Sequence, residues 1–238
     1  MTPRALHIQN EASGPARLFV EELEGRGFDV VTIDARLDRL PESPDGFAAI
    51  LSGGGTADTH QTDEHPWLIH EVALLRRAIE AGVPTMGLCL GAQLLTEAAG
   101  GTVYRCDPPE VGWFEVEAGP EATADPVMGA LPPRFMAMQW HLYACRLPGA
   151  AMELARNTAC VQALRIGEAA WGTQFHIETT REILVSWADM APEELAKFGY
   201  DRTRYDAELD RYGPAHEAIG RDMAGRFAEV AVRHLQTV

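Results

Sequence analysis

Apolar runs and amphipathic stretches alternate along the first half of the chain. Apolar runs bounded by turn residues predict buried strands. Apolar residues at helical spacing, opened by proline and closed by glycine, predict helices between them. The predicted strands cover residues 4–10, 28–35, 45–55 and 83–89, and the predicted helices cover residues 15–27, 65–82 and 92–99. This alternation is typical of a parallel sheet that is covered by helices on both faces.

The pattern changes after about residue 102. Short strand-like runs with close turns predict antiparallel additions and hence a mixed sheet. They cover residues 111–119, 134–140, 151–157, 160–167 and 169–175. From residue 180 the chain is helical and charged, and glycine and proline punctuate it into the segments 181–191, 192–199, 201–213 and 216–238. We therefore expect one domain over residues 1–180 and a helical extension over 181–238 that packs on it.

The last predicted helix carries four apolar residues at helical spacing. They are Ile219, Met223, Phe227 and Val230. Such a stripe predicts a face that packs on the domain. A surface for a partner protein is the alternative that the sequence leaves open.

Composition narrows the class of protein. The chain has 238 residues, of which 46% are hydrophobic and 23% charged, as in ordinary globular domains. Its formal net charge of -15 repels nucleic acid and anionic membrane surfaces, so we expect neither as a partner. No run of 18 uncharged apolar residues and no signal segment is visible, and we expect a cytoplasmic protein.

The cysteines do not form a disulfide or zinc pattern. Cys89, Cys106, Cys145 and Cys160 lie far apart and include no C-x-x-C pair. A chain of this size does not need disulfides for stability, so reduced thiols are expected. One of them is then free to act as a nucleophile.

Cys89 has a context that the other cysteines lack. It lies in the stretch "GLCLG", between Gly87 and Gly91, where a predicted strand turns directly into a predicted helix. This is the pattern of a nucleophile elbow, in which the reactive side chain projects from a strained turn above the sheet. A helix N-terminus also favours thiolate over thiol. The alternative is a small buried hydrophobic residue, the usual role of a lone cysteine.

A cysteine nucleophile needs a base, and the base needs an orienting partner. The stretch "WGTQFHIETT" supplies His176 at the end of a buried run and Glu178 two residues later. In an extended chain residues i and i+2 point the same way, so the carboxylate can hold the imidazole in one tautomer. Taken singly, each residue has a structural interpretation, as a hydrogen-bonded histidine and a helix-start acid. Their conjunction predicts a triad with Cys89.

Acyl chemistry at a thiol also requires donors for an oxyanion. Three glycines, Gly53, Gly54 and Gly55, follow the third predicted strand and offer backbone N–H groups, and Leu90 offers another. A flexible turn is the alternative interpretation of the glycines. A phosphate loop is disfavoured because no Lys-Ser or Lys-Thr follows them.

These motifs together resemble the class I glutamine amidotransferases. The stretch "LSGGG" resembles the family's oxyanion strand, "VPTMGLCLGAQLL" its nucleophile elbow and "WGTQFHIE" its His-Glu segment. The segments "EVGW" and "MQWH" resemble stand-alone members that are similar to the amidotransferase half of GMP synthase. The resemblance covers about residues 45–180. It implies a three-layer, flavodoxin-like α/β fold with a mostly parallel central sheet, antiparallel additions and a helical tail.

The resemblance also implies roles for single residues. Cys89 becomes the nucleophile, His176 the general base and acid, and Glu178 the residue that orients it. Gly54 and Leu90 become oxyanion donors. The same resemblance assigns Gln93 a contact with bound glutamine and places His141 in the stretch "QWHLY", whose backbone holds the amino-acid head of the substrate; packing is the alternative for His141.

Three positions depart from the family pattern. Gly55 and Ile177 stand where proline is usual, and "HLYACRLP" stands where stand-alone relatives tend to read His-Gly-Asp. None of these changes removes a reacting atom. The third lies near the expected substrate mouth and leaves open which γ-glutamyl compound is used.

The expected reaction is hydrolysis of the γ-amide of glutamine, or of a γ-glutamyl compound, through a γ-glutamyl thioester, without a cofactor. The ammonia either passes to a separate synthase subunit or is simply released by a hydrolase or transferase. A catalytically silent binding or regulatory subunit with the same fold is the alternative from another class, and an elbow-cysteine relative with redox or glyoxal chemistry is a third.

The stretch "DTHQTDEHPW" contains four residues of metal-ligand type. They are His60, Asp63, Glu64 and His65. Polar loop and helix-capping roles are the expected interpretation, because the proposed acyl chemistry requires no metal. We therefore predict no metal site.

Overall fold

The computed structural model describes residues 2–236. Nine strands form one sheet in the order β2-β1-β3-β4-β9-β8-β7-β5-β6. The strands are β1 (Arg4–Gln9), β2 (Asp29–Asp34), β3 (Ala49–Ser52), β4 (Thr85–Leu88), β5 (Thr102–Ala118), β6 (Arg134–Arg146), β7 (Ala151–Arg156), β8 (Val161–Ile166) and β9 (Ala170–Thr173). The helices are α1 (Arg17–Gly25), α2 (Trp67–Ala81), α3 (Leu90–Ala98), α4 (Arg181–Met190), α5 (Pro192–Lys197) and α6 (Arg202–Leu235), with 3-10 turns η1 (Pro120–Ala124) and η2 (Met128–Ala130).

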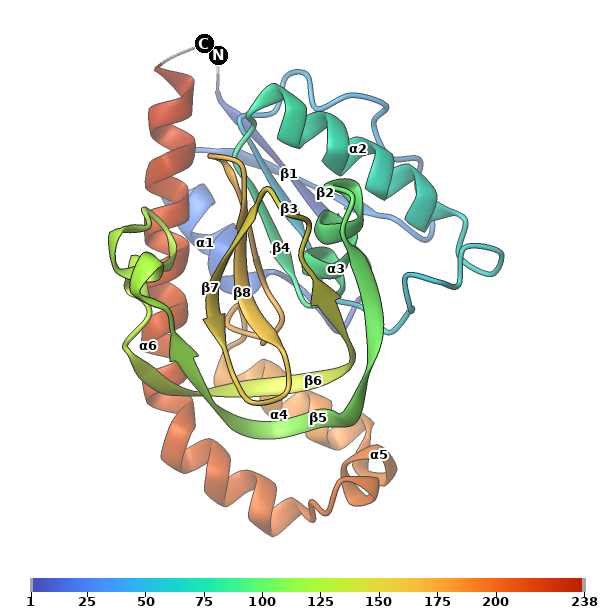
Figure 1. Cartoon of the computed structure of the whole chain (residues 1–238), viewed down its shortest axis with the longest axis vertical. Coiled ribbons are helices and arrows are strands. Elements are labelled where there is room, and N and C mark those ends of the chain that lie inside the picture. The colour runs from blue at the N-terminus through green and yellow to red at the C-terminus, as the bar shows by residue number, and fades with distance from the viewer. Residues whose placement is uncertain (1, 237–238) are drawn as a thin grey trace.

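The five strands from β2 to β9 form the parallel half of the sheet. Their order, with β9 in last place, is that of flavodoxin-like sheets. Every residue of β3, β4 and β9 is buried, because helices cover both faces. Helices α1 and α6 contribute to the core on one face, and α2 and α3 to the core on the other (Figure 1). The predicted three-layer α/β architecture is confirmed.

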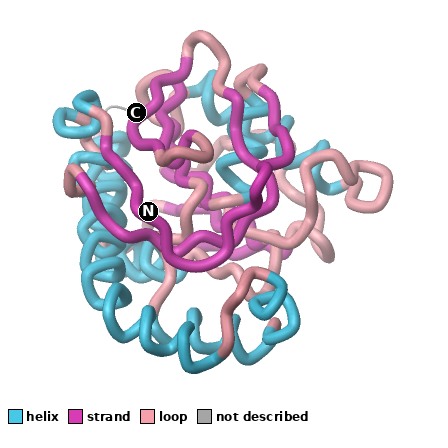
Figure 2. Tube along the Cα trace, turned by 60° about the horizontal axis from the view of Figure 1, so that its bottom comes forward, coloured by secondary structure: helices cyan, strands magenta, loops and turns pink. Residues whose placement is uncertain are grey.

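The other four strands are antiparallel, and β5 and β6 form a long curled hairpin below the parallel half (Figures 1 and 2). The hairpin is paired from Thr102 and Arg146 to Glu117 and Arg134. The predicted strands over 111–119 and 134–140 were therefore too short. The Asp-Pro-Pro sequence at 107–109 indicates a turn, whereas the structure absorbs it as an irregularity within β5.

The C-terminal segment after Asp201 is one helix of 34 residues, although glycine and proline predicted a break near residue 213. Pro214 lies inside α6 and removes one backbone hydrogen bond. Packing on both sides of it compensates, because Leu209 belongs to the core beneath the hairpin and Met223 to the core against α1. The predicted apolar stripe packs as expected, since Phe227 is fully buried and Ile219 and Val230 pack against the same core.

Helices α4 and α5 lie against the hairpin at the lower end of the molecule (Figure 1). Trp187 and Leu195 pack there with Trp113 and Met138 in a separate core cluster. This packing places α4 and α5 beside the carboxyl ends of β4 and β9, the edge where open α/β sheets bind ligands. Among residues 2–236, no helix has the length and apolar character needed to span a membrane.

Candidate active site

Cys89 occupies a sharp turn between β4 and α3. Its φ of 51° and ψ of -103° lie in a region that side chains rarely adopt. Within residues 2–236 it is the only non-glycine residue with positive φ. Its N–H donates to the carbonyl oxygen of Thr173 at 2.8 Å, which fixes the turn to β9. The sulfur therefore sits at the N-terminus of α3, where the partial positive charge favours a thiolate.

The glycines on both sides of Cys89 are required by close backbone approaches. A Cβ on Gly91 would lie 2.1 Å from the carbonyl oxygen of Ser52, and a Cβ on Gly87 would lie 2.6 Å from the carbonyl carbon of Gly91. Neither backbone neighbour can move without disturbing the sheet. The turn thus has the geometry of the predicted nucleophile elbow.

His176 and Glu178 follow β9 and form the predicted pair. The ring Nδ1–H of His176 donates to Oε1 of Glu178 at 2.8 Å. The His176 N–H donates to the carbonyl oxygen of Met138 in the hairpin, at 2.9 Å. Glu178 is fully buried. Because Nδ1 is engaged, Nε2 is the ring nitrogen that remains for proton exchange with a neighbouring group.

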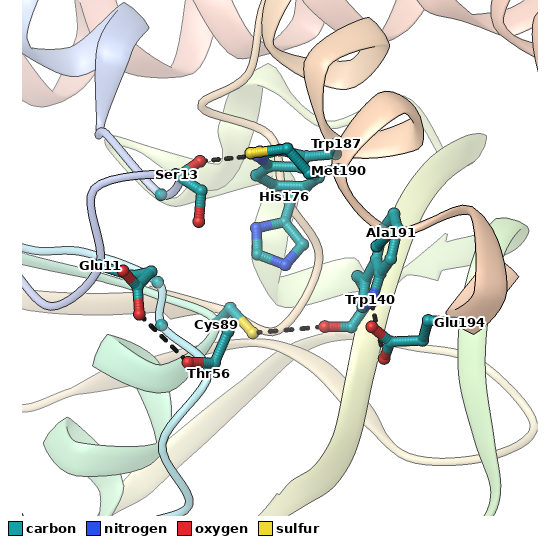
Figure 3. Close-up of a pocket in the computed structure, with 13 residues that line it drawn as sticks. Glu11, Ser13, Thr56, Cys89, Trp140, His176, Trp187, Met190, Ala191 and Glu194 are labelled. Atoms are coloured by element: carbon teal, nitrogen blue, oxygen red, sulfur yellow. Dashed lines mark hydrogen bonds between the residues drawn. The ribbon is translucent and has the colours of Figure 1, made fainter.

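The imidazole and the thiol lie on either side of Gly54. A Cβ on Gly54 would lie 3.3 Å from Cε1 of His176 and 3.8 Å from Cβ of Cys89. The sulfur of Cys89 lies 3.9 Å from the carbonyl oxygen of Trp140, and Nε2 of Gln174 donates to it across 3.6 Å. Figure 3 shows the sulfur and the imidazole facing the same space. Residues about 90 positions apart are thus brought to one place.

The electrostatics favour an ion pair between sulfur and imidazole. Burial alone would raise the pKa of the Cys89 thiol, but the charge and hydrogen bonding of His176 outweigh it and lower that pKa. Burial alone would lower the pKa of His176, but the charges of Cys89 and Glu178 raise it well above its usual value. The arrangement therefore stabilises a thiolate beside an imidazolium.

Cys89 and His176 open into a cleft of about 230 Å³. Its walls come from the loops after β1 and β3, from β6 and from α4 and α5 (Figure 3). The lining residues are Glu11, Ser13, Gly14, Gly54, Gly55, Thr56, Cys89, Trp140, His176, Trp187, Met190, Ala191 and Glu194. The cleft is large enough for a small molecule whose reacting carbonyl lies against the sulfur.

The predicted oxyanion donors occupy different positions around this cleft. Gly54 and Gly55 line it. Leu90 is the first residue of α3, so its N–H has no partner inside the helix. Gly53 does not line the cleft, and its N–H donates to the carbonyl oxygen of Ile8 at 2.9 Å. The structure thus uses the Gly53 amide in the sheet, whereas Gly54 and Leu90 lie next to the sulfur.

Comparison with known families agrees with this geometry. The profile of the family glutamine amidotransferase class-I matches residues 17–183, which is more than half of the chain. The chain belongs to the class I glutamine amidotransferases. The fold agrees as well, because a glutamine amidotransferase from Thermotoga maritima superposes with a TM-score of 0.85 at 23% identity, over 96% of this chain and 99% of the other.

Similar curated proteins cover different lengths. A glutamine amidotransferase-like protein of Salmonella typhimurium, YfeJ, is 25% identical over 81% of this chain and 83% of its own. A glutamine-hydrolysing component of the GMP synthase from Sulfolobus acidocaldarius is 28% identical over 68% of this chain and 82% of its own. The gamma-glutamyl-L-1-hydroxyisopropylamide hydrolase of a Pseudomonas species is 28% identical over 51% of this chain, which spans only 44% of that enzyme.

Two residues with predicted substrate roles lie outside the cleft of this amidotransferase. Gln93 is buried, and its Nε2 donates to the carbonyl oxygen of Tyr143 at 3.1 Å and to Oε1 of Gln174 at 3.2 Å. Gln174 in turn donates to the sulfur of Cys89. His141 is buried on the far side of β6 from the cleft lining. Gln93 and His141 thus lie behind the nucleophile.

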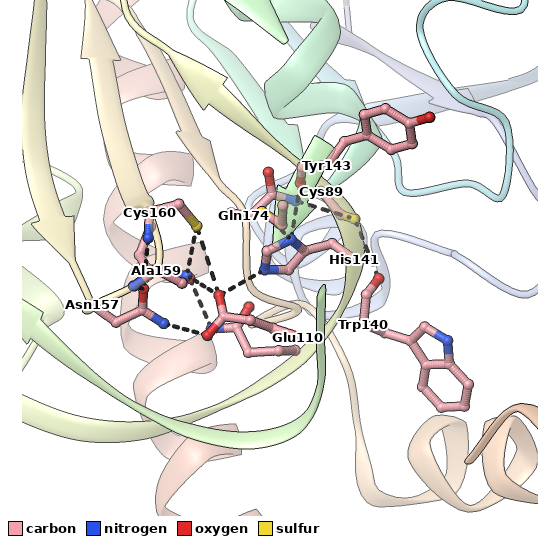
Figure 4. Close-up of polar contacts among 12 residues, drawn as sticks. Cys89, Glu110, Trp140, His141, Tyr143, Asn157, Ala159, Cys160 and Gln174 are labelled. Carbon is pink, nitrogen blue, oxygen red and sulfur yellow. Dashed lines mark hydrogen bonds and ion pairs between the residues drawn. The ribbon is translucent and has the colours of Figure 1, made fainter. Parts of the chain in front are cut away.

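His141 belongs to a second cluster of reactive residue types, formed by Glu110, His141 and Cys160 (Figure 4). Their ligand atoms lie within 4.8 Å of one another, the only such grouping of three in residues 2–236. Both carboxylate oxygens already have partners, because Asn157 donates to Oε1 at 2.6 Å and Gln162 to Oε2 at 3.0 Å. The cluster is thus a closed hydrogen-bond network under the hairpin.

The polar stretch after β3 does not assemble a grouping of that kind. In the described part of the chain, Gln61 donates to Glu64 at 3.3 Å, and the ring of His65 stacks near that of Trp67. His60 packs edge-on against Tyr143. These contacts are the polar and packing roles that the sequence suggested for this stretch.

Sequence reasoning missed the outer walls of the cleft. Trp140, Trp187, Met190 and Glu194 line it, although the sequence pattern indicated no role for α4 and α5 beyond packing. The edge of Trp187 meets the ring of His176 at 4.7 Å between centroids. The only signal in the sequence was the density of aromatic residues around "QWH" and "SWADM".

Proposed function

We propose that this protein hydrolyses the γ-amide of glutamine or of a γ-glutamyl compound, with Cys89 as nucleophile. The observation that carries the proposal is the convergence of a strained cysteine at a helix N-terminus with a buried His-Glu pair in one cleft. Family membership supports it.

The reaction proceeds in two halves. The Cys89 thiolate attacks the γ-carbonyl carbon, and the oxyanion that forms accepts hydrogen bonds from backbone N–H groups near Gly54 and Leu90. As the C–N bond breaks, His176 gives its proton to the departing nitrogen. The same histidine then takes a proton from water, which attacks the thioester and releases glutamate and the thiol.

Glu178 keeps the ring of His176 in the productive tautomer. It accepts from Nδ1 and stabilises the imidazolium that forms during each half reaction. Its second oxygen, Oε2, is buried without a partner among the described residues. This carboxylate therefore has its main polar contact with the imidazole.

The departing nitrogen belongs either to ammonia or to a larger amine. The name of the Pseudomonas relative describes hydrolysis of an amide of an amino alcohol, which supports a leaving group larger than ammonia. The name of the GMP synthase relatives supports the alternative, in which ammonia passes to a separate synthase subunit. Assays with glutamine and with γ-glutamyl amides, each without added partner, separate the two.

Trapping the acyl-enzyme tests the nucleophile. A glutamine-like electrophile should label Cys89, as mapped by mass spectrometry, and Cys89→Ala should abolish both the label and turnover. Cys145→Ala is the matched control, because burial raises the pKa of the Cys145 thiol to about 12 and keeps it protonated. Label on another residue, or silence of the wild-type protein on every γ-glutamyl substrate, contradicts the proposal; the latter favours a binding protein with this fold.

A further inference from the structure

The side of the cleft that receives the leaving group is aromatic. Since His176 protonates the departing nitrogen, any substituent on that nitrogen extends past the imidazole. Trp187 meets the ring of His176 edge-on, with centroids 4.7 Å apart, and Trp140 meets Trp187 in the same way at 5.9 Å. Met190 completes this wall (Figure 3). An apolar chain on the leaving nitrogen can therefore bury its methylenes here.

The same part of the cleft carries acidic but no basic side chains. Glu11 and Glu194 are its charged lining residues apart from the triad, and no lysine or arginine lines it. Glu11 is already neutralised, because it pairs with Arg36 and accepts from Thr56 at 3.1 Å. It is therefore a weak candidate for recognising a further cation.

Glu194 differs from Glu11 because it has no ion-pair partner in residues 2–236. Its Oε1 accepts from Nε1 of Trp140 at 3.2 Å, which fixes the carboxylate at the edge of the aromatic wall. The main chain of the same Trp140 lies at the sulfur of Cys89. A half-buried carboxylate beside aromatic faces attracts a cation through both charge and ring electrons and repels an anion.

We infer that the preferred substrate is a γ-glutamyl amide of a short diamine, whose free ammonium group is recognised by Glu194. The inference rests on the proposed function, since it names the leaving group of that reaction. The apolar middle of the diamine lies along Trp187 and Met190, and the ammonium group lies between Glu194 and the ring of Trp140. The net charge of -15 also favours the approach of a cationic substrate.

Three substrates of equal length test the inference. They are the γ-glutamyl conjugates of 1,4-diaminobutane, butylamine and 4-aminobutanoate, which end in an ammonium, a methyl and a carboxylate group. We expect kcat/KM to be about tenfold higher for the diamine conjugate than for the butylamine conjugate, and lowest for the carboxylate. Equal values for the three conjugates, or an advantage of the carboxylate, overturn the inference.

Two neighbouring substitutions assign the effect to Glu194. Glu194→Gln should reduce the ratio of diamine to butylamine kcat/KM towards one. Glu193→Gln removes the same charge one residue earlier on α5, where the side chain is exposed and outside the cleft, and should leave the ratio unchanged. If Glu194→Gln lowers kcat/KM equally for all three conjugates, Glu194 binds the glutamyl head and the inference is wrong.

Binding without turnover separates this inference from the proposed function. If the wild-type protein hydrolyses none of the conjugates, the proposed function fails. Calorimetry with the Cys89→Ala protein then still compares the affinities of the intact conjugates. Tighter binding of the diamine conjugate supports recognition by Glu194, and equal affinities contradict it.

Discussion

The two halves of the sheet each hold a buried group of cysteine, histidine and glutamate, yet their surroundings differ. In the parallel half, Cys89, His176 and Glu178 meet at the open edge of the sheet. In the antiparallel half, Glu110, His141 and Cys160 meet beneath the hairpin (Figure 4). Burial does not distinguish them, because Cys89 and His176 are each 5% exposed and Cys160 and His141 are 3% and 4% exposed.

The difference lies in strain and in hydrogen-bond satisfaction. Cys89 stands on a turn with positive φ at a helix start, and its sulfur has only long polar contacts of 3.6 and 3.9 Å. Cys160 lies just before β8, and Glu110 of its cluster accepts from three different side chains. A reactive site therefore depends on what the backbone leaves unsatisfied and not on residue types alone.

Removing the thiol on the open side should produce the largest effect. Cys89→Ala should lower turnover of the best γ-glutamyl substrate by about 10⁴-fold or more, because no other group can form the thioester. Cys160→Ala makes the equivalent change in the closed cluster and should leave kcat within a small factor of wild type. Steady-state kinetics on both proteins checks the pair. A similar loss in both variants would mean that the two groups act together.

Neutralising the carboxylate behind His176 should come next. Glu178→Gln should lower kcat by about 10²- to 10⁴-fold, because the imidazole loses its orienting acceptor. In the wild type the lowered pKa of Cys89 and the raised pKa of His176 predict a plateau of kcat/KM between an acidic and an alkaline limb. Loss of the Glu178 charge lowers the pKa of His176, so the alkaline limb should move to lower pH. Glu168→Gln, in an exposed turn, should keep the wild-type profile.

The strained elbow should be sensitive to a single methyl group. Gly91→Ala should destabilise the protein by about 3 kcal/mol or more, since the added Cβ overlaps the carbonyl oxygen of Ser52. Gly25→Ala adds the same group at the end of α1, where nothing lies within 4 Å, and should be neutral or slightly stabilising. Denaturant unfolding compares the two. Equal stability of the variants would show that the elbow is not held as tightly as the contacts indicate.

The closed cluster should respond in stability more than in turnover. Glu110→Gln places an amide N–H₂ against existing donors and should cost about 1–3 kcal/mol, with kcat changed far less than by Glu178→Gln. Burial alone would lower the pKa of His141, but hydrogen bonds with Cys106 and Glu110 raise it to about 9. Its stabilisation is therefore complete below the ordinary value of 6.5 and is lost as the pH rises through about 9. This pH dependence of unfolding should weaken in Glu110→Gln.

The comparison also shows which features the sequence could predict. The alternating pattern placed the strands and helices of the parallel half, and the spacing of Gly87, Cys89 and Gly91 predicted the elbow that the structure contains. The two halves of the hairpin were underestimated, because Pro108 and Pro109 indicated a turn inside β5. Pro214 likewise predicted a break that tertiary packing of α6 overrides.

The cleft walls and the second cluster were beyond local patterns for a physical reason. Glu110 and Cys160 are 50 residues apart and meet only because the hairpin curls over β8. Trp187 and Glu194 reach the cleft only through the packing of α4 and α5 under that hairpin. Periodicity reports which face of a helix is buried, but it carries no information about which distant strand end that face covers.

One contact links the order of synthesis to the assembly of the site. His216 of α6 donates from Nε2 to the carbonyl oxygen of His176 at 2.8 Å, and Gly220 packs so closely on Ile177 that a Cβ there would lie 2.2 Å from its carbonyl oxygen. The segment that holds the imidazole is thus anchored by a helix made after every strand. A growing chain can fold its whole sheet and remain inert until this helix has docked, which delays the appearance of a reactive thiolate until the fold is complete.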